Sequence, residues 1–115
     1  MATKITVGEY LVHPDEVRNA FVDFSKTLAD TGDSLTGTPL VTEVTTSDLT
    51  LANKAVGSTT FTDDDGHVWT TGKYITFTVS GWLDDTDYEV LVKPTTDAAN
   101  AETLAKIVKF RCRGN

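Results

Sequence analysis

Apolar and polar residues alternate along two stretches in the second half of the chain, residues 74–80 and 88–92. In both stretches a large apolar side chain stands at every second position. Because successive side chains of a strand point to opposite faces, each stretch has one apolar and one polar face. The intervening residues 81–87 contain glycine and three aspartates, which favour turns. The pattern predicts two strands joined by a tight loop.

Shorter runs elsewhere predict further strands, each bounded by polar or glycine-containing segments. In residues 19–28 three apolar side chains share one face, while Phe21 lies with Asp23 on the other. An aromatic ring on that second face indicates that the face is partly covered. In the next strand the pattern places Leu40 and Val44 inward. The remaining predicted strand segments are residues 40–46, an apolar pair at 49 and 51, residues 58–62, residues 68–69 and residues 104–113.

Residues 63–66 read Asp-Asp-Asp-Gly and predict a hairpin turn, since aspartate tolerates turn geometry and glycine supplies a positive φ. The functional alternative is a calcium loop. An EF-hand loop needs a glutamate at its twelfth position, and counted from Asp63 that position is Tyr74. We therefore interpret the run as a turn, with a loose surface calcium site as the alternative. His67, just beyond it, is interpreted as a surface residue.

The predicted total is seven or so short strands and no helix, which favours an antiparallel β-sandwich over an α/β sheet. Pro94 is expected to end the strand that begins at Tyr88, because proline has no N–H to donate to a ladder. At 115 residues the chain is one domain, large enough to bury a core without disulfides or metals. We predict an all-β fold with two parts, an N-terminal arm of residues 1–18 and a sandwich of residues 19–115.

The arm is the candidate partner-binding segment. Pro14 separates its apolar residues from the sandwich and breaks regular structure. These residues are too few to fold alone but enough to pack on a neighbouring molecule; the alternative is a frayed terminus. The predicted partner-binding residues are Ile5, Val7, Tyr10, Leu11 and Val12.

The net charge indicates which partners are disfavoured, and the cysteine content indicates the compartment in which the chain is made. A net charge of −7 disfavours binding to nucleic acid phosphates and to anionic lipid, so we expect neither a nucleic-acid nor a membrane partner. Cys112 is the single cysteine and alternates with Phe110 and Val108, which predicts a buried small hydrophobe. With no signal-peptide pattern and no possible intrachain disulfide, we expect a chain made in a reducing cytoplasm.

No pattern typical of catalysis is present, so we predict a protein that is not an enzyme. The two histidines, His13 and His67, lie in the arm and beside a turn, away from any candidate nucleophile. One cysteine and two dispersed histidines do not supply a zinc site, and the chain has no phosphate-binding glycine loop. We therefore predict no cofactor and no metal, and we assign no catalytic residues.

Residues 83–92 resemble the corner of fibronectin type III and immunoglobulin-like domains. In those domains a leucine precedes a turn, and a tyrosine opening the next strand bonds through its hydroxyl to upstream backbone. Leu83 and Tyr88 match the two positions, with a slightly shorter spacing than usual. The resemblance implies that the sandwich is immunoglobulin/fibronectin III-like, with Tyr88 as a residue that stabilises it.

Longer stretches resemble a family of small virion proteins of tailed bacteriophages, often described as fibre–tail adaptor proteins. Residues 22–35, VDFSKTLADTGDSL, are similar to the family's opening VDWxxxLxxGDxI. Residues 77–82, FTVSGW, residues 88–96, YEVLVKPTT, and residues 107–113, IVKFRCR, are similar to its ending. The resemblance covers residues 17–113. The chain departs from the pattern by having Phe24 in place of tryptophan and a longer segment at residues 62–73.

The resemblance implies a non-enzymatic structural protein of a tailed-bacteriophage virion, an adaptor at the neck or tail that helps attach fibres. The implied partners are other virion proteins of the neck, tail, fibre or capsid, with multiple copies per particle. The first alternative is a capsid decoration protein that cements the outer shell. The second is a carbohydrate-binding sandwich module, whose exposed aromatic face would be supplied by Trp69, Tyr74 and Trp82.

Overall fold

The computed structural model describes residues 6–29, 32–44, 48–99 and 101–114, with residues 6–9 described by their backbone alone. Strands dominate the described chain, which confirms the all-β prediction, and one helical turn is present. The elements are β1 (Thr6–Val12), β2 (Arg18–Asp23), α1 (Ser25–Leu28), β3 (Leu35–Glu43), β4 (Thr50–Val56), β5 (Phe61–Thr62), β6 (Val68–Trp69), β7 (Tyr74–Ser80), β8 (Thr86–Thr96) and β9 (Lys106–Cys112).

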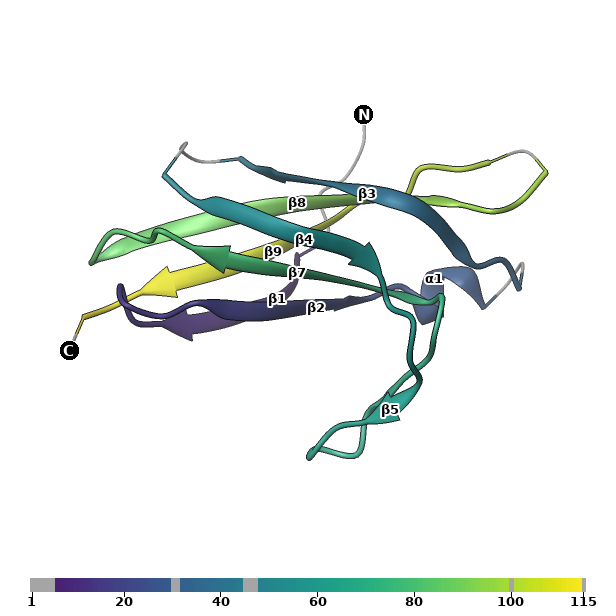
Figure 1. Ribbon diagram of the computed structural model, residues 1–115, viewed down its shortest axis with the longest axis horizontal. Helices are drawn as coiled ribbons and strands as arrows, with labels where there is room; N and C mark the ends of the chain where they lie inside the picture. Colours follow the sequence, from purple (N-terminus) through teal and green to yellow (C-terminus); the bar gives the residue numbers. More distant parts are fainter. Residues whose placement is uncertain (1–5, 30–31, 45–47, 100, 115) are drawn as a thin grey trace.

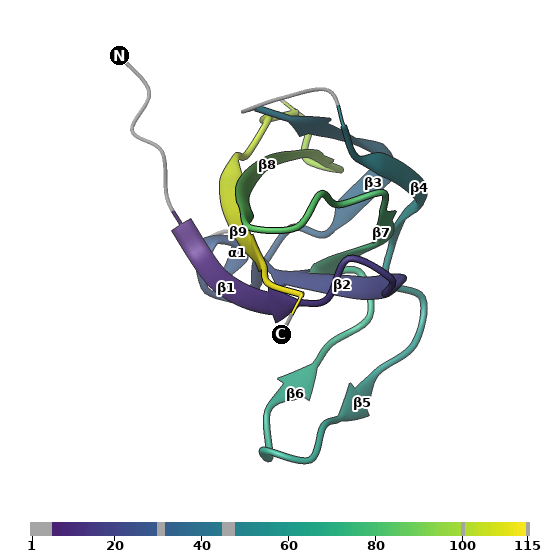
Figure 2. The ribbon, with the colours of Figure 1, turned by 90° about the vertical axis from the view of Figure 1, so that its left-hand side faces the viewer.

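Two sheets lie face to face and enclose the core (Figures 1 and 2). One has four strands in the order β1-β9-β8-β3, and the other has three in the order β2-β7-β4. Neighbouring strands are antiparallel except for β1, which runs parallel to β9. The short strands β5 and β6 form a hairpin that projects from the body between β4 and β7 (Figure 2).

The core is built from the alternating residues of both sheets. Along β7, Ile75, Phe77 and Val79 are almost fully buried, while the hydroxyl residues between them are partly exposed. In β8 and β9 the same alternation faces them from the other sheet. Cys112 lies in this core, as predicted, and burial raises the pKa of its thiol. The core residues from the four-stranded sheet are Val12, Leu35, Val41, Tyr88, Val90, Val92, Val108, Phe110 and Cys112.

The segment between β7 and β8 is a corner rather than a hairpin turn. We predicted that these strands are joined by a tight loop, but they belong to different sheets. The Tyr88 hydroxyl accepts a hydrogen bond from the Leu83 N–H at 2.9 Å and donates one to Asp48 Oδ2 at 3.2 Å. The predicted bond from the tyrosine hydroxyl to upstream backbone is therefore confirmed.

From Thr6 onward the predicted arm is a strand of the four-stranded sheet, so the predicted boundary at residue 18 does not separate an arm from the fold. β1 pairs with β9 from Thr6 to Val12, and Val12 is only 2% exposed. Tyr10 and Val12 are two residues apart, so their side chains lie on the same face of β1, and both pack against the core. Their burial stabilises β1 as a strand of this sheet. Residues 1–5, including Ile5, lie outside the described residues.

Two strand predictions near the start of the chain are wrong in detail. Residues 25–28 form the helical turn α1 instead of continuing β2, because the Asp23 carboxylate accepts the Ser25 N–H at 2.8 Å and turns the chain. Leu40 and Val44 are 56% and 41% exposed, whereas Val41 is buried. Leu40 and Val41 are adjacent and both apolar, and a shift of one residue exchanges the faces of a strand.

Pro94 lies inside β8 and does not end it. The ladder from β3 to β8 has a register shift between Thr36 and Leu40, and Pro94 follows Lys93, the residue that pairs with Leu40. Proline is tolerated in a sheet where the ladder is already interrupted. The Pro94 carbonyl still accepts a hydrogen bond from the Leu104 N–H at 3.0 Å.

Candidate functional site

The first candidate surface is the outer edge of β1, which carries most of the predicted partner-binding residues. β1 is the outermost strand of its sheet, so its free edge has no strand partner among the residues that the structure describes. Leu11 is 69% exposed and points away from the core. Val7 lies in β1, but only its backbone is described. An exposed strand edge with an apolar side chain is a surface on which another chain can dock.

Two of the predicted binding residues hold β1 in place instead of facing outward. The Tyr10 ring stacks on Phe110 with a centroid separation of 5.2 Å. Its hydroxyl lies 3.4 Å from the Phe21 nitrogen and 3.5 Å from the Phe21 carbonyl oxygen, which links β1 to the other sheet. Val12 is in the core. Of the predicted set with described side chains, Leu11 alone is available to a partner, and the predicted binding itself stays a prediction.

The second candidate surface is built where the β5–β6 hairpin folds against the outer face of β2. Phe21 contacts the rings of Phe61, Trp69 and Tyr74 at centroid separations of 5.7, 5.6 and 6.1 Å. These rings join the hairpin to β2 and to the start of β7. The expectation that the face carrying Phe21 is partly covered is therefore confirmed, and the cover is the hairpin.

The base of the hairpin depends on the absence of a side chain at Gly57. A Cβ at this position would lie 2.1 Å from Cζ of Tyr74, so the tyrosine ring rests directly on the glycine backbone. The Tyr74 hydroxyl donates to the carbonyl oxygen of Thr59 at 2.6 Å. The Gly57 N–H in turn donates to the Tyr74 carbonyl at 2.8 Å. Tyr74 is thus buried on the hairpin side of β7, opposite the core.

Asp63 organises the tip of the hairpin. Its Oδ1 accepts the backbone N–H groups of Asp65 and His67 at 2.9 and 3.0 Å, and its Oδ2 accepts the indole N–H of Trp69 at 2.9 Å. The bond from Trp69 is the main reason that the pKa of Asp63 lies below its usual value. The predicted turn at residues 63–66 is confirmed, with Gly66 at a φ of +84°. The carboxylate is occupied by the hairpin itself, which explains the aspartate without calcium.

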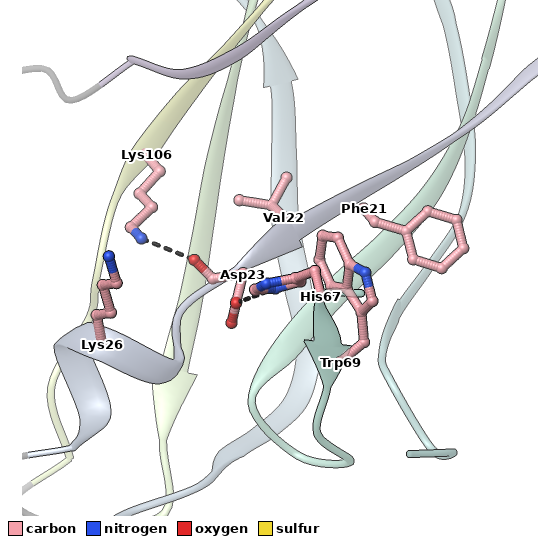
Figure 3. Close-up of a pocket in the computed structure, with 7 residues that line it drawn as sticks. All are labelled: Phe21, Val22, Asp23, Lys26, His67, Trp69 and Lys106. Carbon is pink, nitrogen blue, oxygen red and sulfur yellow. Dashed lines mark hydrogen bonds and ion pairs between the residues drawn. The ribbon is translucent and has the colours of Figure 1, made fainter. Parts of the chain in front are cut away.

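A cleft of about 350 Å³ opens between the hairpin, β2, α1 and β9 (Figure 3). Its centre is Asp23, whose Oδ2 lies 2.7 Å from His67 Nε2. Burial raises the pKa of Asp23, but the hydrogen bonds from Ser25 and His67 outweigh it and hold the pKa below its usual value. The Lys106 ammonium donates to the Asp23 carbonyl oxygen at 2.7 Å. Burial lowers the pKa of Lys106, the negative charge of Asp23 opposes this effect, and the positive charge of Lys26 adds to it.

Sequence reasoning missed this cleft. His67 was interpreted as a surface residue, and although it is exposed, it bonds to a residue 44 positions away. A signal was present, because His67 and Trp69 alternate on one side of the hairpin just as Phe21 and Asp23 alternate on the outer face of β2. The alternation indicates that one face of the hairpin and the outer face of β2 each carry residues suited to contacts, but it does not predict that these two faces pack against each other.

Trp69, Tyr74 and Trp82 do not form the exposed aromatic face that a carbohydrate-binding module was expected to have. Tyr74 and Trp82 are each 3% exposed, and the Trp82 indole donates to the carbonyl oxygen of Glu16 at 2.7 Å. Trp69 alone of the three is half-buried and lines the cleft. Across the described ranges no group of three or more histidine, cysteine or acidic residues is placed to hold a metal ion. None of the helices described is long and apolar enough to cross a membrane.

Comparison with protein-family models, with curated proteins and with solved structures finds no match to this chain.

Proposed function

We propose that this chain is a structural protein of a tailed-bacteriophage virion, an adaptor at the neck or tail that helps attach fibres. The observation that carries the proposal is the resemblance of residues 22–35, 77–82, 88–96 and 107–113 to a family of such adaptors. In the fold these segments contain the end of β2, α1, the end of β7 and most of β8 and β9, and each contributes residues to one core. The matched residues therefore belong to one packing unit, as expected for a shared fold.

The proposal includes an immunoglobulin-like sandwich, and the strand order supports it. In immunoglobulin constant-type domains the sheets contain strands ABED and CFG. With the β5–β6 hairpin set aside, the order β2-β7-β4 corresponds to B-E-D, and β3, β8 and β9 correspond to C, F and G. β1 then takes the place of strand A, but it pairs with the last strand instead of with β2. Tyr88 lies near the start of β8, where these domains have their corner tyrosine.

The docking surface in this proposal is the free edge of β1. A strand edge offers main-chain hydrogen bonds to a partner, and Leu11 adds an exposed apolar contact beside it. The partner is a neck, tail or fibre protein of the same particle. The net charge of −7 favours a docking surface on that partner that is neutral or positively charged.

The position of the protein in the virion tests this function. A reconstruction of particles that contain the chain, with its copy number measured by quantitative mass spectrometry, is expected to place it at the neck or tail in about a dozen copies or fewer, as a cyclic ring requires. Hundreds of copies on the shell would contradict the adaptor role and identify a decoration protein. Absence from purified particles would contradict both.

A matched pair of variants tests the docking edge. Leu11→Asp changes an exposed residue of β1, and Leu40→Asp changes an exposed residue of β3 at the opposite edge of the same sheet. Both are expected to alter the free energy of unfolding by about 0.5 kcal/mol or less. Leu11→Asp should lower incorporation into particles, and Leu40→Asp should leave it unchanged. Equal incorporation of the two variants would exclude the β1 edge as the docking surface.

A further inference from the structure

Two lysines share the rim of the cleft and, among the described residues, have no ion-pair partner. Lys26 extends from α1 and Lys106 from β9 (Figure 3), and they are close enough for the charge of Lys26 to lower the pKa of Lys106. Within the described part of the chain, neither forms an ion pair, although the sequence has 17 acidic residues and only ten lysines and arginines. The Lys106 ammonium lies 4.8 Å from the Phe24 ring centroid and bonds to a neutral carbonyl oxygen. Among the described residues, Asp23 is the acidic group whose charge acts on Lys106, and no acidic side chain forms an ion pair with either lysine.

The acidic residue nearest to the lysines is already occupied. The Asp23 carboxylate accepts the Ser25 N–H through one oxygen and bonds His67 through the other. A carboxylate brought in by a ligand would meet two ammonium groups that lack a charged acceptor. Such a pair of like charges is unfavourable when the cleft is empty, and an anion would relieve it.

The other walls of the cleft indicate which groups a ligand should carry in addition to a carboxylate. Asp23 and His67 add hydrogen-bonding groups on one side, and Phe21 and Trp69 add apolar ring surface. A purely acidic ligand would gain nothing from Asp23. A ligand hydroxyl would donate to a second lone pair of the Asp23 carboxylate, since each of its oxygens has one protein partner. A volume of about 350 Å³ is near the lower limit for small-molecule sites and fits one sugar ring.

We propose that this cleft binds an acidic monosaccharide unit, with the sugar carboxylate at Lys26 and Lys106, hydroxyl groups at Asp23 and His67, and the ring against Trp69. This site does not depend on the proposed role in the virion, because the cleft is formed by contacts within this chain. Of its lining residues, His67 and Trp69 lie in the segment where the chain departs from the adaptor pattern, whereas Val22, Asp23 and Lys26 lie in residues 22–35. The inference would stand if the protein were located elsewhere.

Titration of the full chain with sodium glucuronate, followed by ¹⁵N–¹H NMR, tests the site. The indole N–H of Trp69 and the backbone N–H groups of Ser25 and Lys26 are expected to shift saturably, with a Kd on the order of 1 mM, as is ordinary for one small polar ligand. The indole N–H of Trp82, buried elsewhere in the core, is the internal control and should not move. Trp69→Phe assigns the two indole signals.

Two ligands and two variants make the result decisive. Glucose lacks the carboxylate and acetate lacks the ring, so both should give much smaller shifts than glucuronate at equal concentration. Lys26→Met should weaken glucuronate binding about tenfold, as expected for loss of one charge-assisted hydrogen bond. Lys54→Met removes the same charge from β4, at the far edge of the three-stranded sheet, and should leave binding unchanged. Absent or non-saturable shifts, shifts of equal size with glucose or acetate, or unchanged binding by Lys26→Met would each overturn the proposal.

Discussion

The two-sheet body and the β5–β6 hairpin are held by different forces. Between the sheets, fully buried side chains such as Phe77 and Phe110 fill the space in strict alternation. The hairpin has only two short strands, and its contacts with the body include the partly exposed rings of Phe61 and Trp69 and the bond from His67 to Asp23. Burial of apolar area stabilises the body, whereas the hairpin depends on a few specific contacts. The hairpin should therefore open without unfolding the body.

The largest expected difference in stability is between truncation of an aromatic ring in the body and truncation of one in the hairpin. Phe110→Ala removes a fully buried ring that contacts Tyr10 and Trp82, and should lower the free energy of unfolding by about 3–5 kcal/mol. Phe61→Ala removes a half-buried hairpin ring and should lower it by about 1 kcal/mol or less. Urea denaturation followed by circular dichroism measures both. Equal losses would mean that the hairpin and the body unfold as one unit.

The second prediction compares the loss of stability from a substitution at the base of the hairpin with that from a substitution at the adjacent position. Gly57→Ala forces the Tyr74 ring to move and should lower the free energy of unfolding by about 1–3 kcal/mol, as overpacking does. Ser58→Ala, at the exposed adjacent position, should change it by about 0.5 kcal/mol or less. Thermal unfolding of the two variants provides the comparison. A Gly57→Ala protein as stable as the Ser58→Ala protein would show that the ring does not rest on this glycine.

The body was predictable from sequence to a greater extent than the hairpin contacts. Alternation at Ile75, Phe77 and Val79 fixes which face is buried, because a strand has only two faces. The same rule failed at Leu40 and Val41, where two adjacent apolar residues leave the phase undetermined.

In the candidate site, the turn at residues 63–66 was predictable because its geometry is local. The bond between Asp23 and His67 was not, since it joins residues 44 positions apart. Likewise, Tyr10 and Val12 were interpreted as binding residues because no local pattern shows that they pair with the last strand.

The third effect concerns the corner that joins the two sheets of the body. Tyr88→Phe keeps the buried ring but removes the hydroxyl that bonds Leu83 and Asp48, and should lower the free energy of unfolding by about 1 kcal/mol. Tyr88→Ala should lower it by about 3–5 kcal/mol, because the ring is lost from the core as well. Chemical denaturation gives both values. If Tyr88→Ala leaves stability unchanged, the corner does not hold the sheets together.

The smallest expected effect is a local opening of the hairpin in acid. The pKa values of Asp23 and Asp63 lie below their usual 3.8. Asp63 accepts hydrogen bonds within the hairpin, and at Asp23 the bonds from Ser25 and from His67 of the hairpin outweigh the effect of burial. A carboxyl group that is more acidic when folded contributes stability above its unfolded pKa and loses that contribution as the pH falls through its folded pKa. The Trp69 indole N–H bonds to Asp63, so its NMR shift should show an acid transition with a midpoint below 3.8. The Trp82 indole reports on the body and should not change over the same range, and Asp63→Asn should abolish the Trp69 transition. A midpoint at or above 3.8, or parallel changes of both indoles, would show that acid acts on the whole molecule instead of on the hairpin.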